Sequence, residues 1–267
     1  MIKKLLKISL ILFTAYLLLA FIFTREGSYS FTFERASLKK EVGKVLQNIP
    51  GRYGIFIKNL STNETFLQRE DEVFEPGSLY KLWAMAGVFE QISEGKIKED
   101  DTLIADVVSL NKKFVLDGDE AELQEGEIEF SVKSAIDQMI TISHNYAALA
   151  LLDKIGSQSV TKTTAKDVAN FFEKLYFGEI IDKEYSQKMM DILLRQTIND
   201  RIPKYLPEGT KVAHKTGDIG FFEHDGGVVF SPKGDFIIVV LSETEDPSSA
   251  AEIIARISEA AYKYFNP

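Results

Sequence analysis

The chain has 267 residues, of which 45% are hydrophobic and 27% charged, and this composition is that of a globular protein with a substantial core. Residues 1–26 carry four cations and one anion, so the formal net charge of −9 becomes −12 in the remainder. An acidic body argues against nucleic acid and anionic lipid surfaces as partners. No cysteine is present, so stability must come from burial and not from disulfides.

The first 26 residues read as a targeting segment. Three lysines, at positions 3, 4 and 7, precede a charge-free apolar run of 16 residues from Ile8 to Phe23. Counted as residues 5–23, the run approaches the roughly 20 residues that a helix needs to cross a bilayer. Because no small-residue cleavage site follows, we expect a retained N-terminal membrane anchor with an extracytoplasmic domain at residues 27–267. A cleaved signal peptide and a buried core helix are the alternatives.

Apolar periodicity then predicts helices throughout and strands near both ends of the domain. The expected helices are 35–48, 78–93, 132–155, 165–176, 183–195 and 248–265. The expected strands are 53–60, 65–68, 211–214, 226–230 and 236–242, with a hairpin turn at 231–234. The fold class is therefore α/β (α+β), with one antiparallel sheet flanked by terminal helices. A sheet lobe of about residues 35–75 and 208–267 would hold an inserted all-helical lobe of about 76–207, with a cleft between them.

The first motif with chemical potential is Ser78-Leu79-Tyr80-Lys81, at the start of a predicted helix. Residues three apart share a helix face, so Ser78 Oγ and Lys81 Nζ can come within hydrogen-bond reach. A serine hydroxyl needs a base to become a nucleophile, and lysine serves only if its pKa falls. Burial and a second nearby lysine would both lower it. Alone, the motif also fits an ordinary helix start with a solvated lysine.

The second motif, Ser143-His144-Asn145, lies within the predicted helix 132–155. It offers a hydroxyl for proton relay and an amide that can bind a substrate carbonyl. In isolation, a capping or solvated polar cluster explains it equally well.

The third motif, Lys215-Thr216-Gly217, is expected at the end of a strand. Lys215 and Thr216 suit a carboxylate, and Gly217 leaves room for a close approach. A simple turn is the alternative. The order of all three motifs, each on the expected element, is what makes a shared site the better explanation.

Together the motifs resemble the Ser-x-x-Lys, Ser-Asp-Asn and Lys-Thr-Gly motifs of class A β-lactamases and penicillin-binding proteins, and the similarity spans most of residues 35–265. The resemblance implies that family's sheet-plus-helical-lobe fold and an acyl-enzyme mechanism without cofactor or metal. It implies Ser78 as the acylated nucleophile, Lys81 as its base and Ser143 as the relay to the leaving nitrogen. Substrate binding would fall to Asn145, Lys215, Thr216 and Gly217. The backbone N–H groups of Ser78 and Asp218 would form the oxyanion hole.

The sequence also departs from that pattern. His144 stands where the family has Asp, and the loop between Asn145 and Lys215 lacks the Glu-x-x-Leu-Asn motif that positions the deacylating water. Glu173 and Glu179 are candidate substitutes for the missing glutamate, neither of them favoured. Arg201 is a candidate for the arginine that binds the antibiotic carboxylate. The other histidines, His214 and His224, are interpreted as neither catalytic nor metal-binding.

Three functions remain open from the sequence. The favoured one is a monomeric penicillin-binding peptidase that acts on the D-Ala-D-Ala ends of peptidoglycan stem peptides, because of the anchor and the missing loop. The second is a β-lactamase that hydrolyses β-lactams. The third is a non-catalytic peptidoglycan or β-lactam sensor, which the presence of both lysines and both serines disfavours.

Overall fold

The computed structural model describes residues 37–116, 121–157 and 160–267. The predicted membrane anchor, residues 1–26, lies outside these ranges and stays a prediction. Within them, no helix combines the length and the apolar character that crossing a membrane requires.

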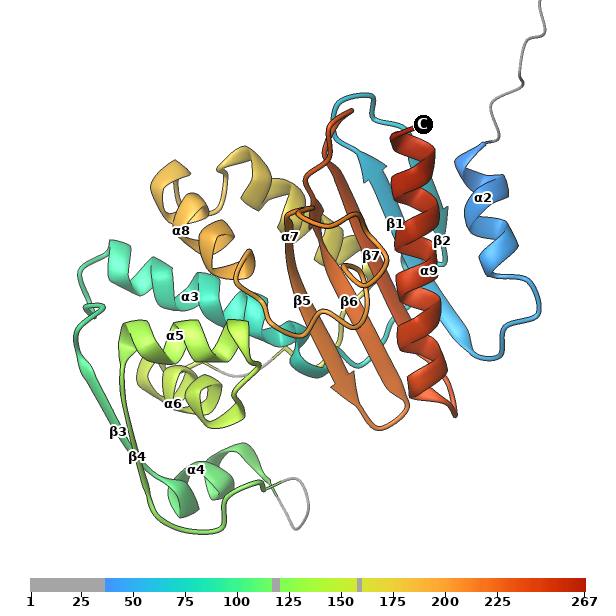
Figure 1. Ribbon diagram of the computed structural model, residues 1–267. Coiled ribbons are helices and arrows are strands. Elements are labelled where there is room, and N and C mark those ends of the chain that lie inside the picture. The colour runs from blue at the N-terminus through green and yellow to red at the C-terminus, as the bar shows by residue number, and fades with distance from the viewer. Residues whose placement is uncertain (1–36, 117–120, 158–159) are drawn as a thin grey trace, which may run out of the picture. The chain divides into compact units, whose positions relative to one another are not determined.

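A five-stranded antiparallel sheet organises the fold (Figure 1). Its spatial order is β2-β1-β7-β6-β5. The strands are β1 (Arg52–Asn59), β2 (Thr65–Gln68), β5 (Val212–Ile219), β6 (Phe222–Val229) and β7 (Phe236–Glu243). Strands from the two ends of the chain meet at β1 and β7, where Tyr53 pairs with Ser242 and Asn59 with Phe236. The predicted sheet built from both termini is confirmed, and β5 is an edge strand.

The two faces of the sheet are covered by different helices (Figure 1). Residues of β1 and β7 alternate between two cores, because successive side chains of a strand point to opposite faces. Ile55 and Ile238 pack with the terminal helices α2 (Leu38–Val45) and α9 (Pro247–Phe265). Phe56 and Val239 pack with the helical lobe. That lobe contains α3 (Lys81–Ser93), α5 (Val132–Thr141), α6 (Asn145–Ile155), α7 (Ala165–Phe177) and α8 (Lys183–Leu193).

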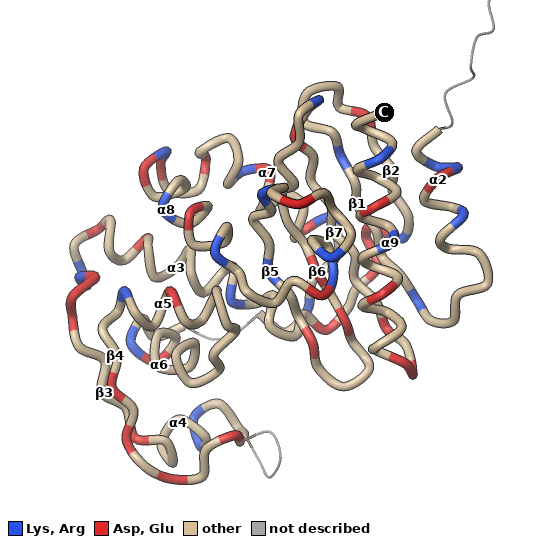
Figure 2. Tube along the Cα trace, in the orientation of Figure 1, with Lys and Arg blue, Asp and Glu red and all other residues tan. Residues whose placement is uncertain are grey.

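The helix α9 carries charged residues of both signs along its length (Figure 2). Arg256 pairs with Glu252 at 2.8 Å and with Glu259 at 3.1 Å, and Lys263 pairs with Glu259 at 2.6 Å. These spacings of three and four residues are those at which side chains meet on a helix surface. The helix is thus amphipathic, with its apolar stripe on the sheet.

The structure contains a small two-stranded sheet and a helix that the sequence did not predict. The strands β3 (Thr102–Asp106) and β4 (Glu127–Ser131) pair in antiparallel register, and α4 (Val107–Phe114) follows β3 directly. Both strands are short and partly exposed, with Ile104 61% exposed. Such strands have a weak sequence signature because neither face is fully buried.

Two predicted elements that carry motifs need correction, and the expected strand 226–230 begins earlier, at Phe222 of β6. The expected helix 132–155 is two helices, since α5 ends at Thr141 and α6 begins at Asn145. The expected strand 211–214 extends to Ile219, so Lys215-Thr216-Gly217 lies inside β5 and not at its end. Both corrections concern the segments that carry the second and third motifs.

Candidate active site

Ser78 lies on a short 3₁₀ turn, η1 (Gly77–Tyr80), that leads directly into α3. The side chain of Leu79 is fully buried and holds this turn against the core. Ser78 is half-buried, and Lys81, the first residue of α3, points its Nζ to within 3.0 Å of Ser78 Oγ. The three-residue spacing therefore brings the proposed nucleophile and base into hydrogen-bond contact.

Four oxygen atoms surround the amine of Lys81. Besides Ser78 Oγ, Nζ lies 2.6 Å from the backbone carbonyl oxygen of Ser143, 2.6 Å from Asn145 Oδ1 and 3.2 Å from Ser143 Oγ. The two carbonyl oxygens can only accept, so they take the two N–H groups of a neutral amine. The lone pair of that amine is then left for a hydroxyl proton, which Ser78 can donate.

The environment of Lys81 increases the share of the neutral amine. The side chain is completely buried, and burial lowers its pKa from 10.5 to about 8, against the opposing charges of Asp218 and Glu122. At pH 7 about one lysine in ten is then neutral, whereas an unperturbed lysine is neutral about once in three thousand. Lys81 is thus a usable base at neutral pH.

Ser143 stands between two lysines. Lys215 Nζ donates to Ser143 Oγ at 3.0 Å and to the Thr216 carbonyl at 2.9 Å, while Lys81 contacts the same hydroxyl from the other side. Burial, together with the charge of Lys81, places the pKa of Lys215 well below its ordinary value. A continuous hydrogen-bonded path therefore runs from Ser78 through Lys81 and Ser143 to Lys215, as a proton relay requires.

The break between α5 and α6 positions Ser143. Its φ of 59° lies in the left-handed region, which non-glycine residues rarely adopt. The next residue, His144, is the N-cap of α6, and its Nδ1 accepts from the backbone N–H of Ala147 at 3.2 Å. An aspartate caps a helix in the same manner. The replacement of the family's Asp by His144 therefore keeps a capping group at this point.

Asn145 connects Lys81 to a carboxylate that the sequence did not identify. Its Oδ1 accepts from Lys81, and its Nδ2 donates to Glu122 Oε1 at 2.6 Å. Glu122 is exposed and lies 23 positions before Asn145. No motif marks Glu122 in an acid-rich segment, so only the three-dimensional contact singles it out.

The 3₁₀ turn and β5 approach each other at two glycines. A Cβ on Gly77, whose φ is +48°, would lie 2.8 Å from the backbone nitrogen of Asp218. A Cβ on Gly217 would lie 2.6 Å from the carbonyl oxygen of Pro76. Neither position has room for a side chain. The backbone nitrogens of Ser78 and Asp218 thus lie on directly apposed segments, as a two-donor oxyanion hole requires.

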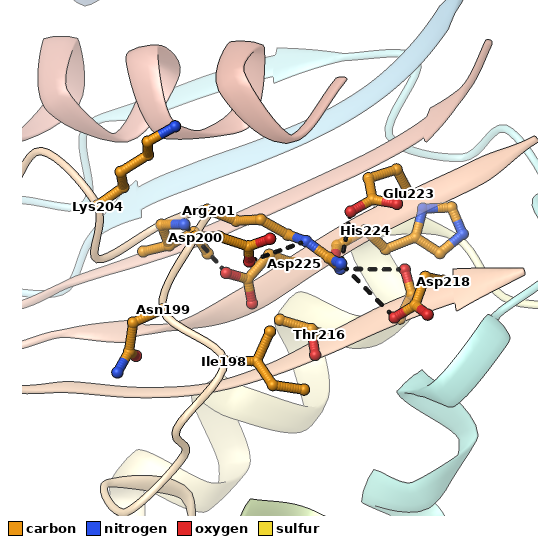
Figure 3. Close-up of polar contacts among 12 residues, drawn as sticks. Ile198, Asn199, Asp200, Arg201, Lys204, Thr216, Asp218, Glu223, His224 and Asp225 are labelled. Atoms are coloured by element: carbon orange, nitrogen blue, oxygen red, sulfur yellow. Dashed lines mark hydrogen bonds and ion pairs between the residues drawn. The ribbon is translucent and has the colours of Figure 1, made fainter. Parts of the chain in front are cut away.

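Arg201 is enclosed by acceptors of the protein itself (Figure 3). Its Nη2 lies 2.5 Å from Glu223 Oε1 and 3.5 Å from Asp218 Oδ1, and its Nε lies 3.5 Å from Asp200 Oδ1. Nη1 donates to the carbonyl of His224 at 2.7 Å. The candidate carboxylate-binding arginine already has carboxylate partners and is only 6% exposed.

Burial raises the pKa of Glu223 to about 7, although the Arg201 charge opposes this. Asp218, Asp200 and Asp225 add to the rise, because like charges disfavour ionisation. Glu223 therefore changes charge near neutral pH, beside the third motif.

The two histidines that flank the third motif have hydrogen-bond partners outside the path from Ser78 to Lys215. His214 Nδ1 contacts Asp225 Oδ1 at 2.9 Å, and His224 Nε2 contacts the carbonyl of Glu75 at 2.7 Å. Both rings are buried within hydrogen-bonded strands. In the described ranges, no group of three His, Asp or Glu side chains is placed to hold a metal ion.

Glu173 and Glu179, the candidate substitutes for the missing glutamate, also have other surroundings. Glu173 pairs with Lys58 of β1 at 2.5 Å. Glu179 lines a cavity of about 600 Å³ together with Trp83 and Lys162. Neither position provides a carboxylate beside Ser78.

A protein-family comparison decides the membership of the chain. The model described as "Beta-lactamase enzyme family" matches residues 37–265. The chain belongs to the β-lactamase enzyme family. Its antiparallel sheet with an inserted helical lobe is the fold of the class A enzymes, as the resemblance of its motifs implied.

Individual relatives are distant but cover most of the chain. A β-lactamase from Bacillus licheniformis is 22% identical over 87% of this chain and 85% of its own length. Among solved structures, PBP-A superposes with a TM-score of 0.74 at 22% identity, over 86% of this chain and 96% of PBP-A. A β-lactamase from Sphaerobacter thermophilus gives a TM-score of 0.75 at 22% identity, over 86% and 97%. At these identities the structures establish the fold alone.

Proposed function

We propose that this chain is a penicillin-binding serine peptidase, acylated at Ser78, whose substrates are the D-Ala-D-Ala ends of peptidoglycan stem peptides. The observation that supports it best is the hydrogen-bonded path from Ser78 through Lys81 and Ser143 to Lys215. A non-catalytic sensor has no need for two buried lysines around one serine, because burying cations costs free energy. The complete relay therefore favours catalysis over binding alone.

Acylation follows from the geometry in two proton transfers. Neutral Lys81 takes the hydroxyl proton as Ser78 Oγ bonds to the substrate carbonyl carbon, and the oxyanion receives the N–H groups of Ser78 and Asp218. The C–N bond then breaks, and Lys81 returns the proton through Ser143 to the leaving nitrogen. The products are an ester at Ser78, a neutral Lys81 and a free amine. Asn145 and Lys215 hold the substrate on either side.

Deacylation lacks the family's usual base. The connection from α6 to α7, residues 156–164, contains no Asp or Glu at all. Its end is fixed near the Ser78 segment, because Thr163 and Phe74 exchange backbone hydrogen bonds of 3.0 and 2.9 Å. Loss of a general base worth about 10²–10⁴-fold raises the barrier by roughly 3–5 kcal/mol. A penicilloyl ester should therefore persist. One solved structure of a PBP-A mutant is an acyl-enzyme complex with penicillin G, which supports this reading.

β-Lactam hydrolysis is the second candidate. The relatives named above include two β-lactamases. In addition, Asn145 bridges Lys81 and Glu122 by hydrogen bonds, so Glu122 places a carboxylate near the base. If Glu122 reached the deacylating water, turnover would become fast.

The cellular location belongs to the same proposal. The lysine-flanked apolar run of residues 5–23 supports a single N-terminal anchor with the catalytic domain outside the cytoplasm, where stem peptides occur. Fractionation of cells that express the full chain, followed by protease treatment of spheroplasts, tests this part separately.

The decisive experiment combines labelling and turnover. Purified protein is incubated with fluorescent penicillin, and intact-mass spectrometry follows gain and decay of the adduct beside a Ser78→Ala control. Release of D-alanine from a D-Ala-D-Ala peptide and hydrolysis of a chromogenic cephalosporin are measured in parallel. We expect a long-lived adduct on the wild type alone and D-alanine release. An adduct on Ser78→Ala would refute the nucleophile, and sustained cephalosporin turnover would make the protein a β-lactamase.

A further inference from the structure

The third motif, expected to bind a substrate carboxylate, lies beside a group of acidic side chains. Thr216 and Asp218 are two residues apart on β5, and their partners on β6 are Asp225 and Glu223. Side chains two apart on a strand and directly paired across strands share a face of the sheet. Thr216 therefore shares its face with three carboxylates, one of them its neighbour along the edge strand.

Arg201 does not make this face positive. It is the cation in contact with Glu223, Asp218 and Asp200 (Figure 3). One guanidinium against these three contacting carboxylates leaves the Arg201 cluster with a net charge of −2 when all are ionised and −1 when Glu223 is protonated. Asp225 adds a further carboxylate to the same face of the sheet. An incoming carboxylate would have to share Arg201 with groups that already neutralise it.

Asp218 is the carboxylate of this group that lies beside the Ser78 turn, because a Cβ on Gly77 would lie 2.8 Å from the Asp218 backbone nitrogen. Its side chain is 58% exposed, whereas that of Glu223 is 10% exposed. Its charge opposes the lowering of the pKa of both Lys81 and Lys215. Asp200 influences neither lysine in this way, although it contacts the same arginine and is equally exposed. Asp218 thus combines an exposed carboxylate with a position next to the turn that carries Ser78.

Thr216, two residues before Asp218 on β5, is a residue of the third motif that was expected to bind substrate. Thr216 is completely buried, and its Oγ1 has no hydrogen-bond partner within the described structure. With no exposed surface, this hydroxyl is closed to a substrate in this conformation. The charge of the subsite is therefore set by the exposed carboxylate of Asp218.

From these observations we infer that Asp218 is a specificity-determining residue that weakens selection for a carboxylate on the leaving side of the acyl donor. The inference rests on the proposed function, because it assigns a role within the same acylation site. Acyl donors whose corresponding group is neutral, such as an ester or an amide, are accepted nearly as well as carboxylates. Removal of the Asp218 charge restores preference for the anion, since two like charges within contact distance repel.

The test compares benzylpenicillin with its methyl ester, which differ in this one charge. Second-order acylation rate constants are measured by intact-mass spectrometry for the wild type, Asp218→Asn and the matched control Asp200→Asn. Any change in the pKa of Lys81 affects both compounds alike and cancels in the acid-to-ester ratio. The same pair is titrated calorimetrically against Ser78→Ala with and without Asp218→Asn, which reports binding without chemistry.

We expect Asp218→Asn to raise the acid-to-ester ratio about tenfold, equivalent to about 1.4 kcal/mol, in both rates and affinities. Asp200→Asn should change it less than about threefold. An unchanged ratio in Asp218→Asn, or an equal rise in both variants, would overturn the assignment while leaving acylation at Ser78 intact. If neither compound acylates the wild type, the proposed function fails, and the binding ratio alone then supports or refutes the charge effect.

Discussion

The pKa of Lys81 makes the pH dependence of acylation a direct test of the mechanism. The rate should follow the fraction of neutral Lys81, which rises as pH increases through about 8. That fraction is about 1% at pH 6, about 9% at pH 7 and about 90% at pH 9. We therefore expect the acylation rate constant to rise about tenfold per unit below pH 7 and to level off above pH 9. An unperturbed lysine would give a rise that continues beyond pH 10.

The assay is stopped-flow acylation by benzylpenicillin, with Ser78→Ala as the background for hydroxide-driven hydrolysis. Because Glu223 titrates near the same pH, the profile is repeated in Glu223→Gln, where the rise should persist. Lys81→Ala should lose about 10²–10⁴-fold and the pH-dependent rise together. A pH-independent wild-type rate between pH 6 and 9, or a normal rate for Lys81→Ala, would remove Lys81 as the base.

Three further predictions concern the groups around this lysine. Gly217→Ala should destabilise the protein by about 1–3 kcal/mol and abolish most acylation, because the new Cβ meets the Pro76 carbonyl. Melting curves check the stability and penicillin labelling checks the acylation. Unimpaired labelling would contradict the close approach of β5 to the Ser78 turn. His144→Ala should cost about 1 kcal/mol of unfolding free energy through the lost helix cap, whereas His144→Asp should retain it, as denaturant titration would show. Glu122→Gln keeps a side-chain oxygen for the Asn145 amide but removes a charge, so the acylation profile should move to lower pH; a longer penicilloyl lifetime in this variant would instead identify Glu122 as a deacylating base.

The sequence predicted those parts of the site that depend on local spacing. Ser78 and Lys81 are three residues apart at a helix start, so any helical turn brings them together. The helical break at Ser143 was not predictable in the same way. Residues 132–155 keep an apolar helical pattern throughout, and neither glycine nor proline marks residues 142–144. The left-handed φ of Ser143 is held by tertiary contacts to two lysines.

Contacts between distant segments account for what the sequence could not reveal. Glu122 meets Asn145 across 23 positions, and Arg201 meets Glu223 across 22. No local spacing rule links such residues, and acidic side chains are common in this chain. Arg201 was identified as a candidate for binding an anion because the predicted strand 236–242 contains no arginine. Because Arg201 is already paired with carboxylates of the protein, it does not offer a free positive charge to an incoming anion.

The site as a whole keeps its positive charge low, and this follows from placing two lysines around one hydroxyl. If Lys81 and Lys215 were both protonated, two buried cations would share Ser143 as their neighbour, which is the arrangement that repulsion and burial disfavour most. The two amines therefore titrate as a coupled pair. A proton taken from Ser78 enters a site where protonation of both amines is unfavourable. The transfer of this proton onward through Ser143 to a leaving nitrogen is therefore favourable.

The coupling between the two lysines also returns Lys81 to its neutral form once the ester has formed, so Lys81 is available to activate a water molecule. Residues 156–164 supply no carboxylate that could take over this role. If a penicilloyl group excludes water from this position and a small peptide ester does not, the same residues would turn over peptides and still retain penicillin.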